Sequence, residues 1–219
     1  GPVFEVGATD INGDGSPELI IPSFLFSSPS VFTLKDDRLI EVSDALGLKL
    51  GAGPWLSVSF VNHDGDDATP PAIIYGNIGL NNVFSSWNGE SEFSTVFYDQ
   101  SFPHIIEVGT LNETEELFPV QYFNHLVKMF PFLSRRISSR NAFGEMAITG
   151  FLPHGWNLKK IETLESHFFV PSGNGGYKKR ELPKVIQSAA IRDVASSDFN
   201  QDGLVDFIFA TGWDGRRQG

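Results

Sequence analysis

The sequence predicts an all-β protein built from repeated four-stranded sheets, with one short helical insertion. Phe occurs 20 times, and Gly (22) and Pro (13) interrupt the chain often, as expected for many short strands joined by turns. Hydrophobic residues make up 41% of the 219 residues, which is enough to form a buried core. In addition, an acidic loop flanked by apolar strands recurs along the chain. Together these observations indicate a repeat protein of short strands.

The acidic loop is most complete near the two ends of the chain. Both copies have the form strand, D-x-N-x-D-G-x-x-[DE], strand. The first loop covers 10–18 and precedes the apolar segment 19–21, and the last covers 198–206 and precedes 207–210. Two copies of so constrained a pattern indicate a repeated structural unit.

Two weaker copies lie between these loops. In the second, Asn62, Asp64 and Asp66 keep the alternation, although Asp67 replaces the glycine and the last acid is missing. The third, at 110–116, carries uncharged residues at the alternating positions, and we expect it to be free of metal. The loops begin at positions 10, 62, 110 and 198. The first two intervals, of 52 and 48 residues, match a four-stranded propeller blade of about 40 to 50 residues.

Each loop is expected to join the first and second strands of a unit. The expected units are three blades and one partial blade, at 3–50, 51–100, 101–184 and 185–212. Polar turns join the last two strands of the full units, at 35–38, 88–89 and 173–176. The partial unit stops after its second strand, near Thr211. We therefore expect an exposed edge that pairs with another chain or with further blades.

A helical insertion at 124–152 lengthens the third unit. Apolar residues recur at helical spacing over 126–133 and again over 143–148, and Ser138 and Ser139 suit a cap between them. We expect two short helices whose apolar residues pack and do not form a ligand groove.

Charge and composition exclude several classes of function. The net charge of −11 opposes binding to nucleic acid or anionic lipid. The basic clusters at 135–140 and 178–180 are short, and we interpret them as solvated surface. No segment is long and apolar enough to span a bilayer. The absence of Cys excludes disulfides, thiolate nucleophiles and Cys-type zinc sites.

The acidic loops predict calcium sites. Carboxylates at alternate positions of a tight turn gather oxygen atoms around one point, and Ca²⁺ takes six to eight oxygen ligands. The alternative is an Asx turn without an ion, but crowding of like charges favours a cation. The expected ligands are Asp10, Asn12, Asp14, Ser16 and Glu18 in the first loop and Asp198, Asn200, Asp202, Leu204 and Asp206 in the last. Ser16 and Leu204 would contribute main-chain carbonyl groups. The second loop offers weaker candidates in Asn62, Asp64 and Asp66.

The strand–loop–strand pattern resembles the FG-GAP/VCBS repeats of bacterial secreted β-propellers, which are akin to the repeats of integrin α-subunit heads. The first and last loops carry the specific part of this resemblance. It implies calcium at the ten positions named above and a complete ring of about seven blades, of which this chain would supply three and part of a fourth. It also implies an extracellular, cell-surface or periplasmic location.

Motifs for catalysis are scarce in the sequence. It contains no H-E-x-x-H, G-x-S-x-G or Walker motif. We expect the five histidines to be surface or loop residues: His63, His104, His125, His154 and His167. The sequence favours a calcium-stabilised, non-catalytic binding or scaffold module that recognises a protein or glycan, as in cell adhesion or carbohydrate binding. Its aromatic surface would include Trp55, Trp87, Trp156 and Trp213. The alternative is a carbohydrate-active propeller enzyme, either a glycoside hydrolase or a polysaccharide lyase.

Overall fold

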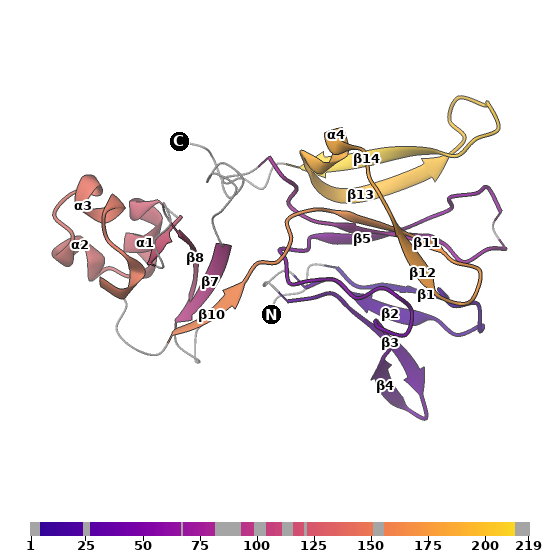
Figure 1. Ribbon diagram of the computed structural model, residues 1–219, viewed down its shortest axis with the longest axis horizontal. Helices are drawn as coiled ribbons and strands as arrows, with labels where there is room; N and C mark the ends of the chain where they lie inside the picture. Colours follow the sequence, from indigo (N-terminus) through magenta and orange to yellow (C-terminus); the bar gives the residue numbers. More distant parts are fainter. Residues whose placement is uncertain are drawn as a thin grey trace. The chain divides into compact units, whose positions relative to one another are not determined.

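The protein is mostly β, as expected, with four small antiparallel sheets and a few short helices (Figure 1). The computed structural model describes residues 5–23, 27–66, 68–81, 93–98, 104–110, 116–120, 122–150 and 156–212. The chain divides into two compact units, one formed by Gly1–Asn82 with Glu162–Arg217 and the other mainly by Val83–Ile161. Within the described residues the sheets form no closed barrel or propeller ring. No helix in these ranges is long and apolar enough to cross a membrane.

The first sheet is a meander of four consecutive strands. In order, they are β1 (Gly7–Thr9), β2 (Glu18–Ile21), β3 (Ser30–Lys35) and β4 (Arg38–Glu41). Asp36 and Asp37 form the two-residue turn between β3 and β4, with φ of 50° and 58°. Two successive positive φ values are typical of a type I′ hairpin turn. The hairpin turn predicted at 35–38 is therefore confirmed.

The second sheet combines two strands that precede the second unit in the sequence with two that follow it. Its strands are β5 (Ser57–Val61), β6 (Ala72–Gly76), β11 (His167–Pro171) and β12 (Tyr177–Arg180), with β6 and β11 at its centre. This corrects the expected grouping, which placed 51–100 in one unit and 101–184 in the next. Loop spacing marks where a first strand meets a second but does not show which later strands complete the sheet. The predicted turn at 173–176 is present between β11 and β12.

The third sheet has two strands among the described residues. β13 (Ala190–Ser197) pairs with β14 (Asp206–Gly212), and the register shifts between Ile191 and Asp193. One short helix, α4 (Lys184–Gln187), precedes β13.

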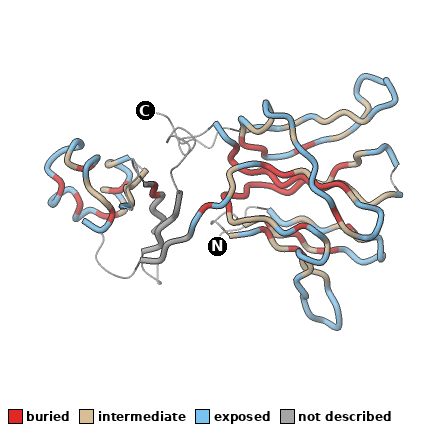
Figure 2. Tube along the Cα trace, viewed as in Figure 1, coloured by how far each residue is buried: buried red, intermediate tan, exposed pale blue. Residues whose placement is uncertain are grey.

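β6 is buried on both faces because a sheet packs against each side of the second sheet (Figure 2). Ile73 and Tyr75 belong to a core shared with the first sheet. Ala72 and Ile74 belong to a core shared with β13. Successive side chains of a strand point to opposite faces, so this stack of three sheets explains why β6 is a continuous apolar run. Each fully buried Ile contributes about 1.5–3 kcal/mol through the hydrophobic effect.

The second unit contains a four-stranded sheet and most of the helices. The strands, in spatial order, are β10 (Trp156–Lys160), β7 (Phe93–Tyr98), β8 (His104–Thr110) and β9 (Leu117–Pro119). The helical elements are α1 (Phe123–Met129), α2 (Leu133–Arg136), α3 (Arg140–Gly144) and a 3₁₀ turn, η1 (Ile148–Gly150). The insertion is thus wider than 124–152, and its described residues form three short α-helices where two were expected.

The helical part of the insertion is held together by its apolar residues. Leu126, Leu133 and Phe143 are buried in one core with Val108 of β8. The prediction that these residues serve packing is confirmed. Ser139 caps α3, because its hydroxyl oxygen accepts the N–H of Ala142 at 3.1 Å, which satisfies a donor that the first turn leaves without a partner.

Candidate metal-binding loops and surface cavities

The first acidic loop connects β1 to β2 and is organised by its own backbone. The Asp10 carboxylate accepts the N–H groups of Gly13 at 2.7 Å and Gly15 at 2.8 Å. The Asp14 carboxylate accepts the N–H of Ser16 at 2.8 Å. Gly15 has a φ of +87°, in the left-handed region that favours glycine. The alternating acids therefore shape the loop by accepting its backbone N–H groups.

The last acidic loop, between β13 and β14, repeats this layout. The Asp198 carboxylate accepts the N–H groups of Asp202 at 3.0 Å and Gly203 at 2.9 Å. The Asp202 carboxylate accepts the N–H of Leu204 at 2.8 Å. The φ of Gly203 is +87°, the same as that of Gly15. Two segments far apart in sequence thus adopt one local structure.

The second loop, between β5 and β6, shares part of the layout. Asn62 accepts the N–H of Asp64 at 3.2 Å, and Asp66 accepts the N–H of Ala68 at 2.9 Å. The Thr69 hydroxyl donates to the Asp64 carboxylate at 3.0 Å and so satisfies an oxygen that an ion would otherwise bind. Asp67 of this loop, residues 111–115 of the third loop and the turn at 88–89 lie outside the described residues.

Glu18 closes the first loop from the start of β2 and is fully buried. Its carboxylate accepts the N–H of Ile11 at 3.1 Å and the side-chain amide of Asn12 at 3.0 Å. The same amide donates to the Asp14 carboxylate at 3.0 Å. Burial raises the pKa of Glu18, and the charges of Asp14 and Asp10 raise it further, although the N–H of Ile11 lowers it. This carboxyl group therefore lies in a negative field that the loop's own N–H groups do not fully offset.

Backbone hydrogen bonds have the opposite effect on other acids of the loops. Burial acts to raise the pKa of Asp10, but the N–H groups of Gly15 and Gly13 outweigh it, and the pKa lies below its usual value. The N–H of Asp66 is the main cause that lowers the pKa of Asp64. Both groups are charged at neutral pH, as ligands of a cation must be.

The donors of the first and last loops suit a hard cation in their chemistry. They are carboxylate, amide and carbonyl oxygens, which Ca²⁺ prefers. The carboxylates of Asp14 and Glu18 both accept the side-chain amide of Asn12, at N···O distances of 3.0 Å. As ligands of Ca²⁺, these oxygens would instead lie about 2.3–2.6 Å from the ion. Among the described residues no three His, Cys, Asp or Glu side chains form a group that could hold a metal ion. The backbone hydrogen bonds are those of Asx turns, and a carboxylate that accepts one or two of them keeps further lone pairs for a cation.

Tyr177 of β12 links the first and second loops, and sequence reasoning did not find it. Its hydroxyl group lies 3.0 Å from the carbonyl oxygen of Ile11 and 2.8 Å from that of Pro71. Burial, followed by the charges of Glu18 and Asp10, raises the pKa of Tyr177, so the hydroxyl remains a donor. No sequence pattern marks this residue, because the contact joins segments more than one hundred residues apart.

Two residues expected on the surface lie in the core. Trp55 is 1% exposed and packs against Tyr75 and His167, with ring centroids 6.1 and 5.6 Å away. His167 is 7% exposed, because β11 lies at the centre of its sheet. Of the other residues in these two predictions, Trp87, His154 and Trp213 lie outside the described residues, and the side chains of Trp156 and His104 are not described.

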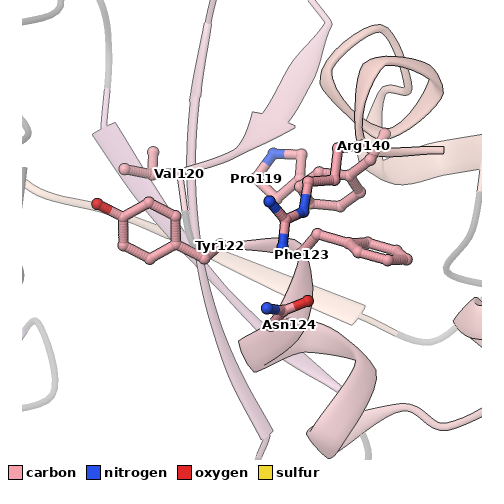
Figure 3. Close-up of a pocket in the computed structure, with 7 residues that line it drawn as sticks. Pro119, Val120, Tyr122, Phe123, Asn124 and Arg140 are labelled. Atoms are coloured by element: carbon pink, nitrogen blue, oxygen red, sulfur yellow. The ribbon is translucent and has the colours of Figure 1, made fainter. Parts of the chain in front are cut away.

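Each unit also carries a surface cavity. One in the first unit, of about 750 Å³, lies beside β12 and α4 and is lined by charges of both signs, among them Lys179, Arg180, Glu165 and Glu181. The other, of about 420 Å³, lies in the second unit next to β9, α1 and α3 (Figure 3).

Comparison with models of known protein families and with curated protein sequences gave no match for this chain. Its function is therefore inferred from its residues and their geometry.

Proposed function

We propose that the chain is part of a calcium-stabilised β-propeller module that binds a protein or glycan outside the cell and is not an enzyme. One observation carries the proposal: the first and last loops share one hydrogen-bonding layout, and in the first this layout surrounds a buried carboxyl group whose neighbours are like charges. A divalent cation would offset that field.

The stacking of the first unit supports a blade arrangement. Three sheets follow one another in chain order, and each has an acidic loop between its first two strands. The loops at 10 and 62 are 52 residues apart. The loops at 62 and 198 are 136 apart, of which the 79 residues of Val83–Ile161 belong to the second unit, leaving 57. Both spacings are close to the length of a propeller blade.

The edge of the third sheet supports association with further strands. Among the described residues β14 pairs only with β13, and Ile208 on β14 is 55% exposed. An edge strand with free backbone groups and an apolar side chain is a template for pairing. In this proposal the strands that pair with this edge belong to another chain or to further blades.

Calcium in this proposal has a structural role. The proposed ligands are those expected from the sequence, namely Asp10, Asn12, Asp14, Ser16 and Glu18 in one loop and Asp198, Asn200, Asp202, Leu204 and Asp206 in the other, with Asn62, Asp64 and Asp66 as a weaker third set. Extracellular modules bind Ca²⁺ with dissociation constants of about 0.1–1 mM. At a calcium concentration tenfold above this constant, each site would stabilise the fold by about 1.4 kcal/mol.

Calcium titration by calorimetry, on protein stripped with a chelator, tests the proposal. We expect binding heat and a rise in melting temperature. Asp202→Ala should remove one ion. Glu181→Ala is the control, because it removes an exposed acid just after β12 and outside the loops, and it should remove no ion. If no heat appears up to several millimolar calcium and the melting temperature does not respond to chelator, the loops are Asx turns only and the proposal is wrong.

Incubation with acidic polysaccharides tests the proposal that the module is not an enzyme. We expect no release of reducing ends or unsaturated products. Turnover that survives purification and depends on residues of this chain would instead support the carbohydrate-active enzyme.

A further inference from the structure

The cavity of the second unit combines aromatic rings with a cationic side chain (Figure 3). It measures about 420 Å³, and its lining includes Pro119, Tyr122, Phe123, Asn124 and Arg140. Figure 3 shows the guanidinium group of Arg140 extending toward Asn124, and the ring of Tyr122 extending away from both. Binding sites for small molecules commonly have such an apolar lining with a few polar groups.

The aromatic part of the lining is accessible. Tyr122 is 55% exposed, and Phe123 is half-buried at the start of α1. Phe143 is buried and packs against Phe123 at a centroid distance of 5.2 Å. The negative face of an aromatic ring attracts the positively polarised C–H groups of a pyranose ring. The cavity therefore offers a stacking surface on a packed base.

The charge of the lining is positive. Arg140 is exposed and forms no ion pair with any described residue. None of the described residues that line the cavity is acidic. The surrounding segment 122–150 has four basic residues and one acidic residue, a formal charge of +3 in a chain of −11. A guanidinium group binds carboxylate or sulfate through paired, charge-assisted hydrogen bonds.

We propose that this cavity binds a sugar unit bearing a carboxylate or sulfate group, within an acidic oligosaccharide. The proposal rests on the binding function proposed above and names the class of its glycan. Arg140 would bind the anionic group, Asn124 would hydrogen-bond a hydroxyl group, and Tyr122 would stack on the sugar ring. The larger cavity of the first unit is a weaker candidate because Glu165 and Glu181 share it with the basic residues.

Calorimetry with defined oligosaccharides tests this proposal on the full chain. The probes are trigalacturonate for carboxylate, a chondroitin sulfate tetrasaccharide for sulfate, neutral maltotriose, and hexaglutamate as an acidic peptide. At least one acidic sugar should bind about tenfold or more tightly than maltotriose and hexaglutamate. Arg140→Gln should weaken that binding about tenfold or more, and Tyr122→Ala should also weaken it. Arg135→Gln is the matched control, because it removes the same charge from α2, outside the cavity.

The proposal is overturned by any of three results with folded protein. These are no binding of either acidic sugar at millimolar concentration, equal losses in the Arg140 and Arg135 variants, or equal binding of hexaglutamate. Binding should persist with chelator, since none of the described residues that line the cavity has a carboxylate that could hold calcium. A requirement for calcium would place the sugar at the acidic loops and would also overturn it. The change in melting temperature on adding calcium, measured on the same samples, tests the proposed calcium-stabilised module separately.

Discussion

His167 is a titratable side chain held in an aromatic environment. It lies on β11 opposite Tyr75 of β6, and its Nδ1 atom has no hydrogen-bond partner among the described residues. Burial, with a smaller effect from the charge of Lys179, lowers the pKa of His167 from 6.5 to about 4. The imidazole is therefore neutral in the folded protein at neutral pH.

The protein should lose stability as the pH falls from 6.5 toward 4. In this window His167 binds a proton in the unfolded chain but not in the folded protein, so protonation favours unfolding. Above pH 6.5 this penalty is absent, and the stability no longer depends on the protonation of His167. The loss should be on the order of 2 kcal/mol. His167→Phe should flatten the dependence, measured by urea unfolding at several pH values. His125→Phe, at an exposed position on α1, should keep the wild-type slope. An unchanged slope in His167→Phe would assign the effect to another group.

Glu18 should respond to substitution in opposite ways with and without calcium. Burial and the charges of Asp14 and Asp10 disfavour its ionised form. Glu18→Gln removes this cost and keeps an oxygen that can accept the N–H of Ile11, so the calcium-free variant should melt at or above the wild-type temperature. It should show a smaller calcium-induced rise, because one carboxylate ligand is lost. Melting curves of the wild type and the variant, each with and without calcium, test both predictions. A variant that responds fully to calcium would remove Glu18 from the proposed ligands.

At the scale of elements, two buried tyrosines of the second sheet form a natural comparison. The hydroxyl group of Tyr177 on β12 contacts the carbonyl oxygens of Ile11 and Pro71. The hydroxyl group of Tyr75 on β6 has no partner among the described residues. Tyr177→Phe should lower the free energy of unfolding by about 1–2 kcal/mol, because it removes a buried hydrogen bond between elements. Tyr75→Phe should be close to neutral. Equal effects in urea unfolding would show that the Tyr177 contact does not stabilise the protein.

The sequence predicted local features of elements better than their pairing. Local chemistry determines the turn at 35–38 and the cap at Ser139, since both depend on residues a few positions apart. The recurrence of the first and last loops was also visible for this reason. The partnership of β6 with β11 was not, because ninety intervening residues carry strands of similar length and composition. The cavity around Arg140 depends on packing between β9, α1 and α3, which no local pattern encodes.

At the scale of the whole molecule, the second unit is inserted at a single point of the second sheet. The chain leaves after β6 and returns before β11, and these strands are paired. The two ends stay together beyond the strands. The N–H of Asn77 donates to the Ser166 hydroxyl oxygen at 2.9 Å, and the N–H of Gly79 donates to the carbonyl oxygen of Leu164 at 3.0 Å. A short linker could therefore join the ends without disturbing the sheet.

Replacement of Val83–Ile161 by a short Gly-Ser linker should leave the first unit folded. The described residues of its cores around Ile73 and Ile74 all belong to that unit, and shortening the connection lowers the entropy cost of closing it. We expect a cooperative melt, a strand-rich circular-dichroism spectrum and the same calcium response as the full chain. Binding of acidic oligosaccharide should disappear, because the cavity around Arg140 is removed. A chain that fails to fold would show that the inserted residues contribute to the core of the first unit, and retained sugar binding would place that site among the stacked sheets.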